Sequence, residues 1–356
     1  MTKKVTAGKI ILTIAVVILA ALLLCAVIYP RAARAVWSNL TSKSVRLPKT
    51  DDWTGGKTYM KVPFAADSEN QYLDLYVPDM KDGETPPLYV IIHGGGFVSN
   101  DSQSKQAQLM YRYFRDHGYA CATVNYRLAD EAPFPGALCD CKAAIRYLRA
   151  HAGEYGYNAE HIAVFGESAG GYLAVMCAVT DDSEFSDVRF IDEDAYEGTS
   201  AQVDMLVDYY GHIDNEGADA DWQQLGIPSP VLSIANSWIS GKVLQGYENV
   251  ESLWFRKNVS KMTAEEKAVV NPYTYIDSHD LANLSVFIIH GDADITVPYL
   301  QSERLSAYLE EKLGPDKVRY LLYPRAGHAA DSLYSEEVLD GVKEFLDNEM
   351  KGRVPA

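Results

Sequence analysis

Eight short runs typical of β-strands alternate with helical patterns from residue 57 onward, and this alternation restricts the possible folds more than any other feature. Such alternation is the signature of a mostly parallel sheet that is covered by helices on both faces. The middle runs are nearly continuous apolar segments, as expected for strands buried on both faces. The first two runs are close enough in sequence to form a hairpin. The candidate strands are 59–63, 73–77, 88–92, 120–125, 161–165, 203–209, 285–289 and 318–322.

Helical patterns lie between these strands, for instance at 102–117, 137–151 and 334–350, but the segment from about 212 to 276 breaks the alternation. More than sixty residues without a convincing strand are too many for a plain connection. The segment contains three tryptophans, which favours an inserted, largely helical cap over a disordered insertion. The sequence therefore predicts an α/β fold with a helical cap insertion.

The strongest chemical motif is Gly166-Glu-Ser-Ala-Gly170, which follows the apolar strand 161–165 and precedes a helical pattern. A serine on a tight strand-to-helix turn has its hydroxyl exposed for attack, and flanking glycines relieve the crowding of that turn. The amino terminus of the following helix favours developing negative charge. Ser168 is therefore the predicted nucleophile.

A second motif, His93-Gly-Gly-Gly-Phe97, directly follows the strand 88–92. Acyl transfer develops an oxyanion that needs preorganised N–H donors, and a glycine-rich turn offers bare backbone amides. We assign the oxyanion hole to the amides of Gly95, Gly96 and Ala169. Three consecutive glycines do not match a dinucleotide or P-loop pattern, which makes a phosphate-binding loop the weaker reading. His93 is expected to brace the loop by hydrogen bonding.

The acid and the base should follow the serine in chain order. Two aspartates, Asp292 and Asp294, lie just after the strand 285–289, and we favour Asp294 as the acid, with Asp292 stabilising the loop. His328 follows Gly327 just after the strand 318–322. A neutral imidazole there can take the serine proton and return it to the leaving group. The predicted catalytic set is thus Ser168, Asp294 and His328.

These motifs resemble the α/β-hydrolase superfamily, and within it the esterase/lipase branch with an HGGG oxyanion loop, which includes hormone-sensitive-lipase-like and acetyl- or feruloyl-esterase-like enzymes. The matching stretches are HGGGF (93–97), NYRLADEAPFPGALCD (125–140), GESAGGYLA (166–174), HGDADITVP (290–298) and AGH (326–328). The resemblance implies an eight-stranded, mostly parallel sheet whose second strand is antiparallel. It also implies hydrolysis of carboxylic esters through a covalent acyl-enzyme, with no metal or organic cofactor.

The same resemblance suggests a small-molecule or carbohydrate ester with a short acyl group, such as acetyl, as the substrate. Two alternatives stay open. A serine peptidase or amidase uses the same three side chains, and a catalytically silent surface binding module keeps the same fold. The sequence does not indicate an oligomeric state.

Twenty residues without a charge, from Ile10 to Tyr29, precede this body. At about 1.5 Å rise per residue they are long enough to cross a hydrocarbon core of roughly 30 Å. We therefore divide the chain into a membrane anchor (1–29), a polar, basic linker (30–50) and a catalytic domain (51–356). Three lysines before the span and two arginines after it favour a cytoplasmic amino terminus and an extracytoplasmic catalytic domain.

Two other readings of this segment remain. One interpretation is a signal peptide that is cleaved at Ala33-Arg34-Ala35. The apolar region of this segment is, however, longer than that of a usual signal peptide, and basic residues follow it. Lipidation at Cys25 is the other, although the leucines before it are not the small residues expected there.

Charge and cysteine content exclude several classes of protein. The net charge is −17, and the first 35 residues hold five basic and no acidic side chains, so the remainder carries −22. Such an acidic body does not suit nucleic acid, whose phosphates need clustered lysine and arginine. The five cysteines form no zinc-binding spacing, and we expect neither a structural metal nor a disulfide framework.

Overall fold

A computed structural model describes residues 29–41, 45–48, 51–81, 84–191, 196, 198–214, 216–227, 244 and 246–353. Except for Tyr29, the predicted membrane anchor lies outside these described residues. Among the helices of the described part, none combines the length and apolar character needed to cross a membrane.

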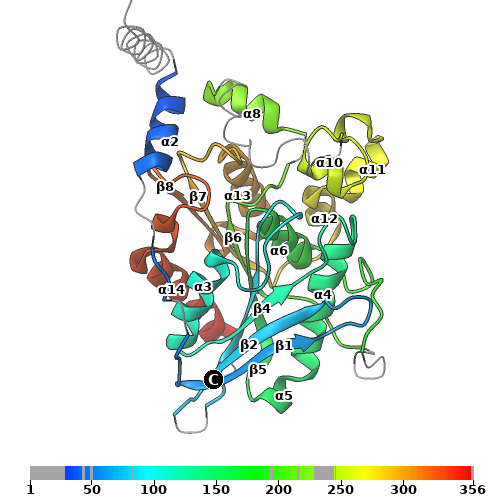
Figure 1. Ribbon diagram of the computed structural model, residues 1–356, viewed down its shortest axis with the longest axis vertical. Coiled ribbons are helices and arrows are strands. Elements are labelled where there is room, and N and C mark those ends of the chain that lie inside the picture. The colour runs from blue at the N-terminus through cyan, green and yellow to red at the C-terminus, as the bar shows by residue number, and fades with distance from the viewer. Residues whose placement is uncertain are drawn as a thin grey trace, which may run out of the picture.

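The core of the molecule is one eight-stranded sheet with the order β1-β2-β4-β3-β5-β6-β7-β8 (Figure 1). β1 pairs with β2, and β2 with β4, in antiparallel fashion, while all other neighbours are parallel. All eight predicted strands are present and the predicted α/β-hydrolase sheet is confirmed, including the initial hairpin and the antiparallel second strand. The strands are Gly56–Pro63, Tyr72–Pro78, Pro87–Ile92, Ala120–Asn125, Asn158–Glu167, Met205–Tyr209, Ser285–Gly291 and Val318–Tyr323 for β1 to β8.

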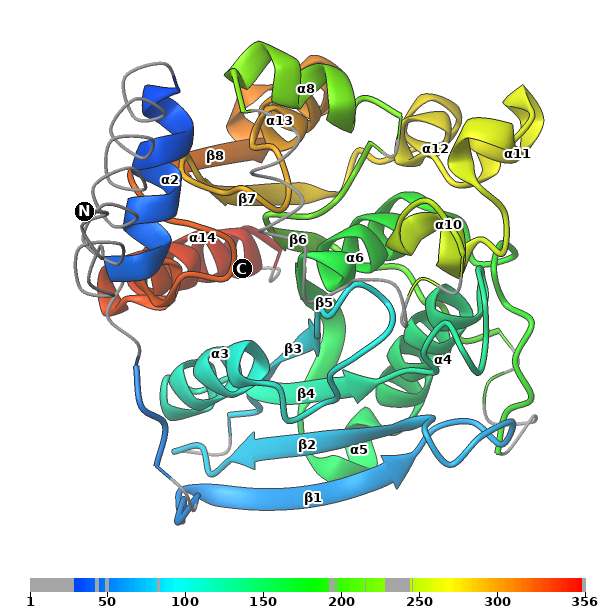
Figure 2. The ribbon, with the colours of Figure 1, turned by 45° about the horizontal axis from the view of Figure 1, so that its top comes forward.

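Helices cover both faces of the sheet, as the near-continuous apolar strands require. α3 (Lys105–Asp116) and α14 (Glu336–Arg353) contribute side chains to the hydrophobic cluster on one face. α4 (Gly136–Ala150), α6 (Ala169–Val179) and α13 (Leu300–Leu313) contribute to the cluster on the other. Figure 2 shows α3 and α14 on one side of the central strands and α4 and α6 on the other. Four of these helices, α3, α4, α6 and α14, match predicted helical patterns.

The register of the parallel strands brings the motifs together at one edge. Ile92 at the end of β3 is paired with Gly166 in β5, and Glu167 is paired with Tyr209 at the end of β6. The loops that follow β3, β5 and β6 therefore begin side by side. Loops at the carboxyl ends of parallel strands are where α/β folds bind ligands.

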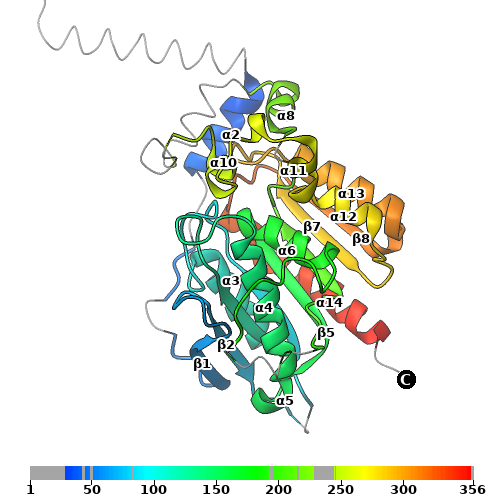
Figure 3. The ribbon, with the colours of Figure 1, turned by 90° about the vertical axis from the view of Figure 1, so that its right-hand side faces the viewer.

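The segment 212–276 contains helices and no strand in its described part. Its elements are α8 (Ala218–Leu225), α10 (Val250–Trp254), the 3-10 turn η2 (Val259–Lys261), α11 (Ala264–Val269) and α12 (Pro272–Ser278). Trp222 and Trp254 are buried, which shows that these helices pack against the body. Figure 3 shows α8, α10 and α11 at the same end of the molecule as helix α2 (Pro30–Thr41). That this segment acts as a cap stays a prediction.

The predicted linker (30–50) is not entirely without regular structure, because Pro30–Thr41 forms helix α2. The segment begins with proline at its first helical position and is rich in alanine, and both features favour a helix. In Figures 1 and 2, α2 lies close to the end of β8.

Candidate active site

Ser168 lies on the turn between β5 and α6, where its φ of 55° is rare for a residue with a side chain. Its N–H donates to Tyr209 O at 2.9 Å, which fixes the turn on the neighbouring strand. The flanking residues Gly166 and Gly170 must be glycine, because neighbouring backbone atoms leave no room for a Cβ. A Cβ added to Gly166 would lie 2.0 Å from Gly170 O, and one added to Gly170 would lie 2.3 Å from Ile92 O. The hydroxyl is thus presented at the edge of the sheet by a backbone that only these glycines permit.

Three side chains from three separate loops form one hydrogen-bonded series. His328 Nε2 is 3.0 Å from Ser168 Oγ, and His328 Nδ1 is 2.7 Å from Asp294 Oδ2. Because the carboxylate only accepts, Nδ1 carries a hydrogen and Nε2 is the nitrogen that can accept the serine proton. The structure therefore brings together all three residues predicted from the sequence.

Asp294 is buried and each of its oxygens is occupied. Oδ1 accepts the N–H groups of Thr296 at 2.7 Å and of Val297 at 3.0 Å, while Oδ2 faces the imidazole of His328. Burial by itself would raise the pKa of Asp294, but His328 and His290 lower it well below its ordinary range. The carboxyl is therefore ionised.

The competing aspartate, Asp292, has a different environment. It is exposed, and its Oδ1 accepts the N–H of Arg325 in the loop that carries His328. This contact joins the two loops without reaching an imidazole, in keeping with the predicted stabilising role.

The sequence assigns no role to His290, the first residue of the HGDADITVP stretch, but the structure places it beside Asp294. His290 is fully buried, with Nε2 3.2 Å from Asp294 Oδ2 and 3.1 Å from Val297 O. Both neighbours are acceptors, so Nε2 carries a hydrogen, and Nδ1 accepts from Ser302 Oγ at 2.8 Å. His290 thus contacts the same oxygen of Asp294 that His328 contacts. Its position four residues before Asp294 was the only signal in the sequence.

Two further residues surround His328 that the motifs did not single out. The Tyr210 ring packs edge-on against the imidazole, with centroids 4.8 Å apart. Glu167 is buried beside the site, and burial raises the pKa of its carboxyl to about 7 despite the N–H of Gly94, which donates to Oε1 at 2.7 Å. Burial lowers the pKa of His328, but the charges of Asp294 and Glu167 outweigh this and leave that pKa raised.

The glycine loop that follows β3 has a backbone conformation that leaves N–H groups available as donors. Gly95 and Gly96 have φ values of 119° and 61°, which disfavour any residue with a side chain. Within the described part of the chain, the N–H groups of Gly95, Gly96 and Ala169 donate no hydrogen bond. His93 braces the loop as expected, because its Nδ1 donates to Gly94 O at 2.7 Å.

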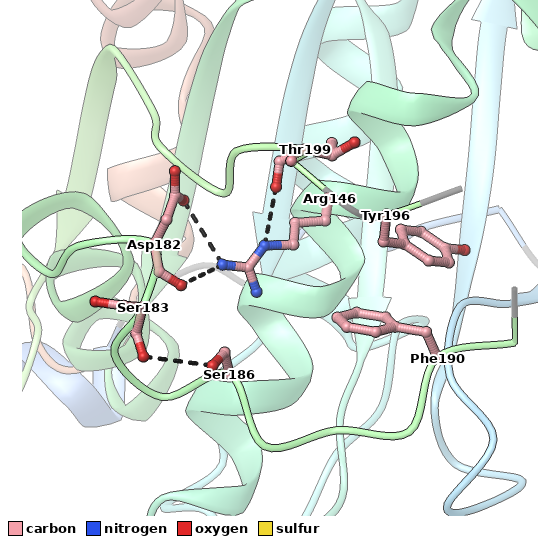
Figure 4. A pocket seen from close by; sticks show the side chains of 8 residues that line it. Arg146, Asp182, Ser183, Ser186, Phe190, Tyr196 and Thr199 are labelled. Atoms are coloured by element: carbon pink, nitrogen blue, oxygen red, sulfur yellow. Dashed lines mark hydrogen bonds and ion pairs between the residues drawn. The ribbon is translucent and has the colours of Figure 1, made fainter. Parts of the chain in front are cut away.

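The described residues around Ser168 form no metal site, and the pocket at Arg146 lies elsewhere. The described residues contain no group of three or more His, Cys, Asp or Glu side chains arranged to hold a metal ion. Figure 4 shows a pocket of about 410 Å³, in which Arg146 donates to Thr199 O at 3.1 Å and contacts Asp182. This pocket is near the carboxyl end of α6, whose eleven residues span about 16 Å from the end that follows Ser168. It therefore does not belong to the site of Ser168.

Comparison with known proteins finds a matching family model and similar esterases and lipases. A model of the BD-FAE family matches residues 73–309. Esterase LipQ of Mycobacterium tuberculosis is 25% identical over 80% of this chain and 61% of its own length. Mouse hormone-sensitive lipase is 36% identical over 32% of this chain and 15% of its own length. The chain therefore covers less than two thirds of these curated relatives.

A truncated carbohydrate esterase from gut microbiota has a similar structure, with a TM-score of 0.64 and 24% sequence identity. The similarity covers 84% of this chain and 98% of that one. At this identity the likeness concerns the fold.

Proposed function

The chain belongs to the BD-FAE family, and from this premise we propose that it is a serine carboxylic-ester hydrolase that acts through a covalent acyl-enzyme. The observation that carries the proposal is the hydrogen-bonded series of Ser168, His328 and Asp294, with contacts of 3.0 and 2.7 Å. A hydroxyl, an imidazole and an ionised carboxylate in this order constitute an activated nucleophile.

In the acylation step, Ser168 Oγ attacks the ester carbonyl while its proton passes to His328 Nε2. The tetrahedral intermediate then expels the alcohol, which takes the proton from Nε2, and the acyl group remains on Oγ. Water repeats the sequence with His328 as base and releases the carboxylic acid. Asp294 stays ionised throughout, holds Nδ1–H and stabilises the imidazolium.

The negative charge of each intermediate needs donors that are already in place. We assign this role to the amides of Gly95, Gly96 and Ala169. The support is that these N–H groups have no other acceptor among the described residues and that Ala169 begins α6, whose amino terminus favours negative charge.

For the substrate we propose an ester with a short acyl group, such as an acetylated carbohydrate. One support is the packing of α10 over the glycine loop. Val250 Cγ1 lies 3.3 Å from the position of a Cβ on Gly96, and the rings of Phe97 and Trp254 stack at 3.8 Å. A helix held so close limits the room beside the oxyanion site. The other support is the carbohydrate esterase whose fold this chain shares.

For the location we propose that residues 1–29 anchor the catalytic domain to a membrane, with that domain extracytoplasmic. The support is the uncharged stretch from Ile10 to Tyr29 and the basic residues on both sides of it.

The experiment that tests the activity compares Ser168→Ala with Ser186→Ala, a matched change in the distant pocket, on p-nitrophenyl esters of increasing acyl length. We expect Ser168→Ala to lose several orders of magnitude in kcat, because the hydroxyl is the group that becomes acylated. Ser186→Ala should retain the wild-type rate. Near-wild-type turnover by folded Ser168→Ala would refute the assignment, and faster turnover of the matching p-nitroanilides would indicate an amidase.

A further inference from the structure

The loop that carries His328 is held by the chain that precedes the sheet. Ser38 Oγ, on α2, donates to the carbonyl of Arg325, and the N–H of Val45 donates to the carboxylate of Asp331. We call these two contacts the N-terminal clasp. The two contacts join residues that are 287 and 286 positions apart in the sequence. Arg325 lies three residues before His328, and Asp331 lies three residues after it.

The backbone of this loop depends on outside support. Arg325 and Ala329 have φ values of 59° and 54°, a left-handed conformation that residues with side chains rarely adopt unless their surroundings hold it. Both sides of Arg325 are held. Its N–H donates to Asp292, in the loop that leads to Asp294, and its carbonyl accepts from Ser38. Ser38 on α2 thus supports this conformation.

The second contact reaches the loop through a buried charge. Asp331 has a side chain that is only 7% exposed, and Lys105 Nζ lies 2.6 and 2.7 Å from its two oxygens. The N–H of Val45 is an additional donor to this carboxylate. A buried carboxylate with several donors is rigid, because each lost donor leaves charge without compensation.

We propose that the N-terminal clasp is a positioning element of the active site, so that the orientation of His328 toward Asp294 and Ser168 depends on α2 and Val45. The proposal rests on the proposed hydrolase function. It makes the segment between the predicted anchor and the sheet a part of the catalytic unit instead of a passive tether.

A consequence concerns the titration of His328. The groups that face the imidazole are the carboxylates of Asp294 and Glu167 and the ring of Tyr210. The two carboxylates raise the pKa of His328. If the loop loosens and the contact with Asp294 weakens, this pKa falls. The acid limb of the rate profile, where protonated His328 cannot act as base, then moves to lower pH.

Two pairs of variants in the full-length protein test the clasp. Ser38→Ala removes the hydroxyl that reaches Arg325. Its control is Thr41→Ala, because the hydrogen bond of Thr41 Oγ1 to a described residue goes to Trp37 O of the same helix, at 2.8 Å. Val45→Pro removes the N–H donor to Asp331, and Val45→Ala keeps it. Each protein is measured for kcat, KM, the pH profile of kcat/KM and hydrogen exchange of the amides in 324–331.

We expect Ser38→Ala and Val45→Pro to lower kcat by about two- to tenfold, the effect of one lost hydrogen bond, with KM unchanged. Their acid limbs should move to lower pH and the 324–331 amides should exchange faster, whereas Thr41→Ala and Val45→Ala should match the wild type.

Equal exchange in all four variants would overturn the proposal, and so would faster exchange without a change in kcat and pH profile. If the wild type hydrolyses no ester, the proposed function fails instead, and exchange alone decides whether the clasp holds the loop.

Discussion

Replacement of Asp294 by asparagine isolates the role of one carboxylate with almost no change in volume. Oδ1 of Asp294 accepts two backbone N–H groups, at 2.7 and 3.0 Å. The amide oxygen of asparagine must occupy this position, since the amide NH₂ would there face two donors. The NH₂ group is therefore directed at Nδ1 of His328, where the wild-type carboxylate accepts a hydrogen.

This geometry forces the imidazole into the wrong tautomer. With a donor opposite Nδ1, the hydrogen moves to Nε2, and that nitrogen can no longer accept the proton of Ser168. In a serine protease with the same arrangement, the equivalent change lowers kcat by about 10⁴-fold, or about 5.4 kcal/mol of transition-state stabilisation. We expect a loss of this order in Asp294→Asn.

The assay is steady-state hydrolysis of p-nitrophenyl acetate by Asp294→Asn and Asp292→Asn at several pH values. Asparagine at 292 keeps an oxygen that can accept the N–H of Arg325, so this control should lose little activity. Asp294 also raises the pKa of His328, and residual activity of Asp294→Asn should therefore persist to lower pH than in the wild type. A larger loss in Asp292→Asn, or near-wild-type kcat in Asp294→Asn, would refute the reasoning.

Three other predictions have defined outcomes. Glu167→Gln keeps a hydrogen-bond acceptor but removes a carboxyl whose ionised form raises the pKa of His328. Because Glu167 has a pKa of about 7 and is only partly ionised over the acid limb of kcat/KM, this limb should move slightly to lower pH, and an unmoved limb would contradict this. Gly166→Ala should lower the free energy of unfolding by at least about 1–3 kcal/mol in urea titrations, because its Cβ would lie 2.0 Å from a carbonyl oxygen. The control is Gly153→Ala, whose added Cβ would have no heavy atom of another segment within 4 Å, and this change should be neutral or slightly stabilising. The full-length protein should stay in the membrane pellet after carbonate washing, and protease added to intact cells should remove its catalytic domain. Recovery as a shortened soluble protein would indicate a cleaved signal peptide, and protection of the domain would reverse the topology.

Features that depend on a local pattern could be predicted from the sequence. The strands β3 to β7 are recognisable because burial on both faces makes each a short apolar run. Ser168 and Asp294 are recognisable because they follow two of these strands, β5 and β7, and His328 because it follows the next parallel strand, β8. The carboxyl ends of parallel strands meet at one edge. The distances between them confirm the proximity, while their catalytic roles stay proposals.

Features that depend on contacts between distant segments could not be predicted. The pairing of His290 with Asp294 requires the turn of the loop after β7, and spacing alone does not show which way that turn directs the ring. The contact of Ser38 with Arg325 joins residues 287 positions apart, and no motif in the segment around Ser38 indicates this partner. The sequence indicates that a segment such as α2 has a high helix propensity. The surface on which the helix packs is decided by the tertiary structure.

The most direct test of the central claim is to identify the residue that a fluorophosphonate modifies. Full-length protein is titrated with the reagent, residual esterase activity is measured, and the modified peptide is located by mass spectrometry. We predict one modification per chain, at Ser168, with activity lost in proportion to labelling and no labelling of Ser168→Ala. Complete inactivation with the label on another residue, or full activity in protein labelled at Ser168, would contradict the proposed mechanism.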